Sequence, residues 1–145
     1  MKSEHSAGGI VLKKENSVIY VLMAQHAQYH GWGFPKGHIG DIFAGESQED
    51  TALREVKEET GIDAEIIKFA CEETYQYKWQ GEKRKKIVYY YVMRYKSGNF
   101  AGKDHEMEAV EWVELDKVEA KLTYDNAKKM FRKLLPEIRE IAKNL

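Results

Sequence analysis

Hydrophobic and polar residues alternate over several short stretches of the chain. Alternation with a period of two, together with many β-branched and aromatic residues, is typical of β-strands. The pattern predicts strands at residues 6–12, 18–25, 32–35, 64–73, 86–95 and 110–113. Polar residues 13–16 and the pair Gln80-Gly81 are predicted to form the turns that join neighbouring strands.

Two other segments have the period of a helix. Residues 48–60 lie between Ser47 with Asp50, a capping-box start, and Gly61, a left-handed stop. Residues 124–144 place apolar side chains on one helical face, and Pro136 is expected to bend or divide that helix. Strands alternating with two helices on opposite faces predict an α/β fold, an α/β/α sandwich with a central mixed β-sheet.

The length and composition of the chain indicate one globular domain over residues 1–145. With 43% hydrophobic residues, the chain can bury a proper core. It has no internal repeat, no apolar run as long as a membrane span and no signal-peptide pattern, so we expect no membrane contact. Its single cysteine, Cys71, cannot form an internal disulfide, and we therefore expect a cytoplasmic location.

The charge balance excludes long-range attraction to polyanions. A net charge of −1 gives no general attraction to DNA, RNA or an anionic membrane, and we expect no DNA partner. A polyanionic substrate must therefore be attracted by local positive charge or by a metal. The basic run at residues 83–86 is such a local charge, although a solvated hairpin end is its ordinary explanation.

Four glutamates, at positions 46, 55, 58 and 59, stand with Arg54 at fixed spacing on what is predicted to be one short helix. Glu55, Glu58 and Glu59 stand at i, i+3 and i+4, so they share one face. Such carboxylates, within about 6 Å of one another, repel unless a cation lies between them. Oxygen ligands suit Mg²⁺, or Mn²⁺ as an alternative. A solvated charged helix is the ordinary alternative, but the defined helix ends and an apolar stripe favour a site.

Residues 46–62 resemble the Nudix box, whose pattern is Gly, five residues, Glu, seven residues, then Arg-Glu-apolar-any-Glu-Glu-any-Gly-apolar. The match is complete from Glu46 to Ile62, and residues 34–39 resemble the strand and loop that precede the box. The box then spans about residues 37–62. Eight residues separate Gly37 from Glu46 where the family usually has five, which indicates a three-residue insertion near residues 40–43. We interpret the box spacing of Gly40 as coincidental.

This resemblance implies a Nudix fold and hydrolysis of a nucleoside diphosphate linked to another moiety. It implies metal ligands at Glu55, Glu58, Glu59, the carbonyl of Gly37 and the distal Glu106, with Glu108 as the second choice for the distal acid. Glu59 is the first choice of general base and Glu106 the alternate, while Arg54 and Glu46 support the helix face. A solvated loop is the ordinary explanation of the acids near Glu106.

Outside the box the chain most resembles hydrolases of diadenosine polyphosphates. The resemblance implies a small-molecule nucleotide substrate bound by Lys36, His38, Lys86, Tyr77 and Tyr124. The lysines and His38 would contact phosphates, and the tyrosines would stack on bases, although Tyr124 is equally well placed as a hydrophobic staple. Removal of pyrophosphate from RNA 5′ ends or from nucleoside triphosphates is the alternative activity, and a non-catalytic nucleotide sensor is the alternative of another class. We expect a monomer or weak homodimer.

Overall fold

The computed structural model describes residues 1–40 and 44–145. Within these residues, seven strands form one mixed sheet: β1 Lys2–Glu15, β2 Val18–His26, β3 Trp32–Gly33, β4 Lys36–His38, β5 Ile62–Trp79, β6 Glu82–Gly98 and β7 Met107–Glu114. The main path is β3-β2-β1-β6-β5, with β4 beside β1 and β7 beside β2. The pair β1–β6 is parallel and the remaining pairs are antiparallel.

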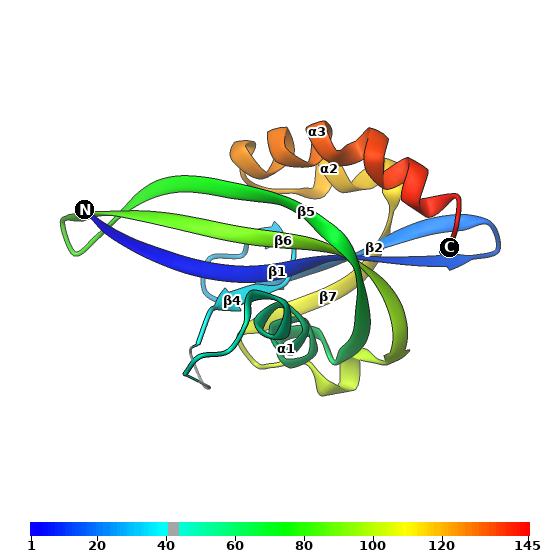
Figure 1. Ribbon diagram of the computed structural model, residues 1–145, viewed down its shortest axis with the longest axis horizontal. Helices are drawn as coiled ribbons and strands as arrows, with labels where there is room; N and C mark the ends of the chain where they lie inside the picture. The colour runs from blue at the N-terminus through cyan, green and yellow to red at the C-terminus, as the bar shows by residue number, and fades with distance from the viewer. Residues whose placement is uncertain (41–43) are drawn as a thin grey trace.

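Helices cover both faces of this sheet (Figure 1). Helix α1 (Gln48–Thr60) lies on one face, and α3 (Asp125–Ala142) lies on the other, preceded by the short α2 (Val118–Lys121). Two 3-10 turns, Phe100–Gly102 and Leu115–Lys117, flank β7. The predicted α/β/α sandwich is confirmed.

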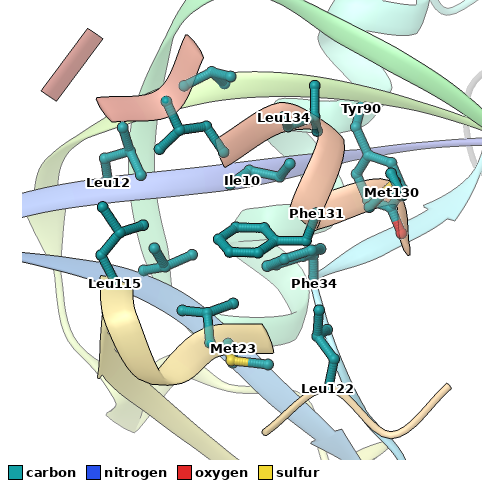
Figure 2. Close-up of a cluster of buried hydrophobic side chains, with 14 of the residues drawn as sticks. Ile10, Leu12, Met23, Phe34, Tyr90, Leu115, Leu122, Met130, Phe131 and Leu134 are labelled. Atoms are coloured by element: carbon teal, nitrogen blue, oxygen red, sulfur yellow. The ribbon is translucent and has the colours of Figure 1, made fainter. Parts of the chain in front are cut away.

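A hydrophobic core lies on each side of the sheet. Under α3, the ring of Phe131 packs against Phe34 with centroids 5.8 Å apart, and Ile10 of β1 lies beside them (Figure 2). Under α1, Val56 packs with Val11 of β1. Strand β1 therefore supplies alternate residues to both cores, as a central strand with two covered faces does.

The hairpin of β5 and β6 is longer than predicted. Irregular register at three places along β5, near Asp63, Ile66 and Phe69, interrupts the alternation on which the prediction depended. The turn itself lies where it was expected, and the φ angles of Gln80 and Gly81 are 51° and 76°. Two residues with positive φ form the tight turn that suits the twist of antiparallel strands.

Three details of the prediction differ from the structure. The strand predicted at residues 32–35 is only β3, Trp32–Gly33, and β4 follows as a separate strand after Phe34 and Pro35. The first turn lies at Asn16 and Ser17 rather than at residues 13–16, because the Glu15–Val18 pair continues the ladder through polar positions. Pro136 does not divide the last helix, which runs unbroken through it. The proline is exposed, so the carbonyl that loses a partner can meet water, while Phe131 and Ile138 hold the helix on the sheet. Among the described residues, no helix is long and apolar enough to cross a membrane.

Candidate active site

Helix α1 begins and ends as its sequence predicts. The Ser47 hydroxyl accepts a hydrogen bond from the Asp50 backbone N–H at 3.1 Å, and Gly61 adopts a φ of 83° just after the last turn. Glu46 lies before the N-cap, so the expectation that all four glutamates lie on the helix is wrong for this residue. The caps fix which residue begins the helix. They therefore also fix which face of the helix packs against the sheet.

Arg54 gathers three of the four carboxylates. Its Nε and Nη2 donate to the two oxygens of Glu46, both at 2.9 Å, in a forked pair. Its Nη1 donates to Glu55 at 2.9 Å and to both oxygens of Glu58 at 3.1 Å. The Thr51 hydroxyl donates to Glu46 at 2.7 Å. The bonds from Arg54 hold the pKa of Glu46 below its ordinary value.

The carboxylate of Glu55 lies directly over the backbone of Gly37. Strand β4 pairs with β1, Gly37 opposite Ala7, beneath α1. A Cβ added to Gly37 would lie 2.0 Å from both Cδ and Oε2 of Glu55. Only a residue without a side chain permits this approach, so the site depends on glycine at this position.

Glu59 has the most perturbed carboxyl group of the site. Its Oε1 accepts a hydrogen bond from the Lys36 backbone N–H at 3.2 Å. Burial, with further contributions from the charges of Glu55 and Glu106, raises the pKa of Glu59 to about 8. The charge of Lys36 acts in the opposite direction. Without a cation this carboxyl therefore holds its proton near neutral pH, and a nearby cation would favour its charged form.

Glu106 reaches this neighbourhood from the loop before β7. The Glu106 carbonyl accepts from Ala27 N–H at 2.8 Å, and the N–H of Asp104 donates to the carbonyl of Glu58 at 3.0 Å. The loop is thus tied to the end of α1. Glu108, the second choice for the distal acid, instead lies 2.8 Å from His30 Nδ1. The structure therefore favours Glu106 over Glu108 as the distal acid.

The donor set of this site suits a hard divalent cation. It consists of carboxylates and a closely approached backbone, which are the ligands that such ions prefer. Over residues 1–40 and 44–145, however, no three His, Cys, Asp or Glu side chains form a ready group of metal ligands. Arg54 engages Glu55 and Glu58, and Glu59 turns to Lys36. The ligand set named from the sequence thus lies in one neighbourhood and stays a prediction.

The side chains of two lysines lie on the sheet face that α3 covers, opposite α1, and both lie close enough to Glu59 to be affected by its charge. Lys36 Nζ donates to the Tyr75 hydroxyl at 3.2 Å and lies 5.3 Å from the centroid of its ring. Lys86 is opposite Tyr75 in the hairpin and opposite Glu4 in β1. Burial lowers the pKa of both lysines, and the charge of Lys36 adds to the effect on Lys86. An anion near Lys36 and Lys86 would favour the charged form of both lysines.

Tyr75 and Glu73 are residues of this neighbourhood that the sequence prediction missed. Glu73 is 7% exposed and accepts a hydrogen bond from Asn126 Nδ2 of α3 at 3.0 Å. Its burial raises its pKa, and its charge supports the charged form of Lys36. Tyr75 could have been found by counting outward from the predicted Gln80-Gly81 turn, which pairs Tyr75 with Lys86. The contact of Glu73 with α3 leaves no such signal.

Tyr77 and His38, two of the residues predicted to contact the substrate, lie around Glu4. The Tyr77 hydroxyl donates to Glu4 Oε1 at 2.5 Å, and Arg84 Nη1 donates to the same oxygen at 3.1 Å. His38 Nε2 lies 3.9 Å from Glu4 Oε2. The hydrogen bond from Tyr77 is the main cause that lowers the pKa of Glu4. The Tyr77 hydroxyl is thus engaged with Glu4, while Tyr75 is the tyrosine in contact with Lys36.

Tyr124 lies at the head of α3 and is 52% exposed. Its ring covers Gly31, where an added Cβ would lie 2.7 Å from the tyrosine oxygen. The neighbouring Thr123 exchanges hydrogen bonds with Trp32 of β3 at 2.8 and 3.2 Å. These contacts fix an exposed aromatic ring at the end of the helix that also supplies Asn126.

Comparison with known proteins identifies the family. The family model for the NUDIX domain matches residues 3–134, most of the chain. The chain belongs to the Nudix family. This Nudix domain is 34% identical over 99 residues to the mutator protein MutT4 of Mycobacterium tuberculosis, a match that covers 68% of the chain and only 39% of that protein. It is 35% identical over 112 residues to the asymmetrical bis(5′-nucleosyl)-tetraphosphatase of Sus scrofa, covering 74% of the chain and 72% of the relative.

A solved structure gives the same result for the fold. The binary complex of the Ap4A hydrolase of C. elegans superposes with a TM-score of 0.72 and 25% identity, covering 94% of this chain and 98% of that one. The prediction of a Nudix phosphoanhydride hydrolase is therefore confirmed. Nudix hydrolases use divalent metal ions, so a divalent cofactor follows from the family, and the choice of metal does not.

Proposed function

We propose that this Nudix domain hydrolyses dinucleoside polyphosphates, such as diadenosine tetraphosphate, with Mg²⁺ as its cofactor and Mn²⁺ as an alternative. The observation that carries the proposal is the similarity to an Ap4A hydrolase over nearly the whole of both chains, together with the match to an asymmetrical tetraphosphatase over 74% of this chain. The neighbouring lysines Lys36 and Lys86, next to a carboxylate cluster, support it, because such a substrate presents a run of phosphates.

In this proposal Glu55, Glu58, Glu59, Glu106 and the carbonyl of Gly37 would hold the ions. Bound divalent ions neutralise charge on phosphate oxygens and lower the pKa of the attacking water. Arg54 and Glu46 take no part in the proton transfer. They hold the cluster in place through the forked pair and through the bonds of Arg54 to Glu55 and Glu58.

The protein side chains then bind the phosphates and accept a proton. Water attacks a phosphorus atom, its proton passes to Glu59, and the bond to the leaving phosphate oxygen breaks in line. Glu106, whose charge is felt at Glu59, is the alternate base. Lys36, Lys86 and His38 contact the phosphates.

The two bases of the substrate need aromatic partners. Tyr77 and Tyr124 are the proposed stacking residues, and Tyr75 joins them because its ring lies against Lys36. Substitution of each ring by leucine, followed by measurement of KM, ranks the three. A stacking residue raises KM, whereas a residue that only packs within the fold lowers the melting temperature.

A second activity, on RNA 5′ ends, has one specific observation in its favour. The basic residues 83–86 continue outward from Lys86 along β6. A non-catalytic sensor has less support, since every acid of the box is present. Pyrophosphate removal from nucleoside triphosphates stays an alternative activity. A cytoplasmic location and a monomer or weak homodimer stay predictions from the sequence.

Replacement of two ligands tests the proposal. Glu58→Gln with Glu59→Gln should abolish hydrolysis of diadenosine tetraphosphate in Mg²⁺, and EDTA should do the same to the unchanged protein. The matched control is Glu72→Gln with Glu140→Gln, which removes the same charge from exposed positions of β5 and α3. Circular dichroism reports on the fold of both variants. Mg²⁺-dependent turnover retained by the first variant would contradict the assigned site. A higher kcat/KM on capped RNA or on deoxynucleoside triphosphates would replace the proposed substrate.

A further inference from the structure

The charge of the chain is divided unevenly between one hairpin and everything else. Residues 78–86 contain five cations and one acid, a local charge of +4, whereas the whole chain carries −1. The remaining residues therefore carry −5. The hairpin turn projects past the helices at one end of the molecule, beside the N-terminus (Figure 1). A cationic tip on an otherwise acidic body is a local attraction for polyanions.

Aromatic side chains alternate with these cations on one face of the hairpin. Tyr75, Tyr77 and Trp79 stand at successive same-face positions of β5, and their partners across the ladder are Lys86, Arg84 and Glu82. The rings of Tyr75 and Tyr77 lie 6.4 Å apart, and the Arg84 guanidinium lies 4.7 Å over the ring of Trp79. The row leads from the contact between Tyr75 and Lys36 to the tip, a distance of about 14 Å for four residues of strand.

Trp79 and two of the lysines around it, Lys78 and Lys83, are exposed at the tip. Trp79 is 50% exposed, although an isolated tryptophan of a small domain is usually better covered. On the other face of the hairpin, Lys78 and Lys83 are opposite one another and both exposed, and Lys85 follows at the next same-face position. Among the described residues, no acid pairs with these three lysines at salt-bridge distance. Their positive charge is uncompensated.

We propose that the hairpin tip, residues 78–85, binds a single-stranded polynucleotide whose 5′ phosphate end lies at Lys36 and Lys86. The lysines hold backbone phosphates, and Trp79 stacks on a base. A row of rings at regular spacing fits separate bases of a single strand, because the bases of a duplex stack on one another instead. An anionic membrane would meet the same lysines, but it gives no reason for a row of rings that continues to the site.

This inference rests on the proposed function, in its second activity on RNA 5′ ends, only for the position of the 5′ end. Binding is therefore measured apart from turnover, in EDTA, by the fluorescence anisotropy of a short 3′-labelled oligonucleotide with a 5′ hydroxyl. The assay compares the affinities for four ligands: single-stranded RNA, single-stranded DNA, the matching duplex, and vesicles of phosphatidylserine with phosphatidylcholine. Binding of either single strand in preference to duplex and vesicles supports the proposal, and the ratio of the two affinities identifies the natural polymer.

Variants separate the tip from general charge. Lys78→Gln with Lys83→Gln should weaken binding and reduce the dependence of log K on log salt by about 1.4, since each lost phosphate contact to a single strand removes about 0.7. Lys129→Gln with Lys133→Gln removes the same charge from exposed positions of α3 and should leave both values unchanged. Trp79→Ala should weaken binding by about 5- to 150-fold, and Trp79→Phe should restore most of it.

These tip variants should hydrolyse diadenosine tetraphosphate as the unchanged protein does, which shows that they fold. Equal binding by the tip and control variants would overturn the inference, as would duplex or vesicle binding that matches or exceeds single-strand binding. Absence of hydrolysis in the unchanged protein would instead count against the proposed function and leave this binding result intact.

Discussion

The close approach of Gly37 to Glu55 gives the sharpest test of the site. In Gly37→Ala the new Cβ would lie 2.0 Å from the carboxylate carbon of Glu55. Ordinary contact between carbon atoms is about 3.5–4.0 Å, so the carboxylate must move by about 1.5–2 Å. Such a movement breaks the 2.9 Å bond from Arg54 to Glu55. It also removes the carboxylate from the place where a metal ion would meet it.

The expected effect is large on activity and moderate on stability. A misplacement of about 1 Å at a reacting centre can cost about 100-fold, so kcat/KM should fall by about 100-fold or more, which corresponds to about 2.7 kcal/mol. The clash meets the end of a side chain rather than backbone, so the free energy of unfolding should fall by about 1–3 kcal/mol, as in ordinary overpacking.

Steady-state hydrolysis in Mg²⁺ measures kcat/KM. Urea unfolding of the same preparation measures the free energy of unfolding. Gly33→Ala is the matched control, because an added Cβ there meets no atom within 4 Å and Gly33 has no positive φ. It should change the free energy of unfolding by less than about 0.5 kcal/mol and leave kcat/KM near that of the unchanged protein. The reasoning fails if Gly37→Ala retains kcat/KM, or if the control loses as much activity.

Two further predictions concern the charges of the cluster. Arg54→Gln should lower the free energy of unfolding by about 3–5 kcal/mol in urea, because it removes the guanidinium that donates to Glu46, Glu55 and Glu58. Arg132→Gln, at an exposed pair, should cost much less, and equal losses would show that Arg54 is no more than a surface partner. In EDTA, the stability that Glu59 contributes is fully present below its unfolded pKa near 4.5 and is lost as pH rises towards about 8, because only the folded chain keeps the proton. Glu59→Gln should flatten thermal stability over that window, and an unchanged slope would mean that the buried carboxyl is not the titrating group.

Helix α1 could be predicted from the sequence because its signals are local. Ser47 and Gly61 specify the two ends of the helix, and the spacing of Glu55, Glu58 and Glu59 follows from its pitch alone. The contact of Gly37 with Glu55 is not local, since it depends on β4 lying beneath the helix. Gly37 was named as a ligand within the family resemblance, because a glycine permits close backbone approach, but no local pattern placed it beside Glu55. The expected insertion near residues 40–43 lies largely outside the described residues.

The hairpin shows where pattern reasoning stops. The turn at Gln80 and Gly81 was correctly located, yet the strands on either side extend well beyond the apolar residues that marked them. Backbone pairing needs no apolar side chain, so a strand can continue through charged residues. A hydrophobic pattern assigns such charged strand ends to a loop. The family resemblance named Tyr77 and not Tyr75, although the register pairs Tyr75 with Lys86 and the Tyr75 hydroxyl accepts a hydrogen bond from Lys36. The Asn126–Glu73 contact joins residues far apart in the chain, and no periodicity reveals it.

The arrangement also explains how so many acids can lie together without a cation. Arg54 compensates three of them, and the proton that burial keeps on Glu59 compensates the fourth. Metal binding is then an exchange, in which an ion must displace that proton and share the carboxylates with Arg54. Glu58 is best able to turn, because its side chain is 39% exposed while that of Glu46 is 8% exposed. Affinity for Mg²⁺ should therefore rise with pH up to about 8, and the forked Glu46 pair should persist in the metal-bound enzyme.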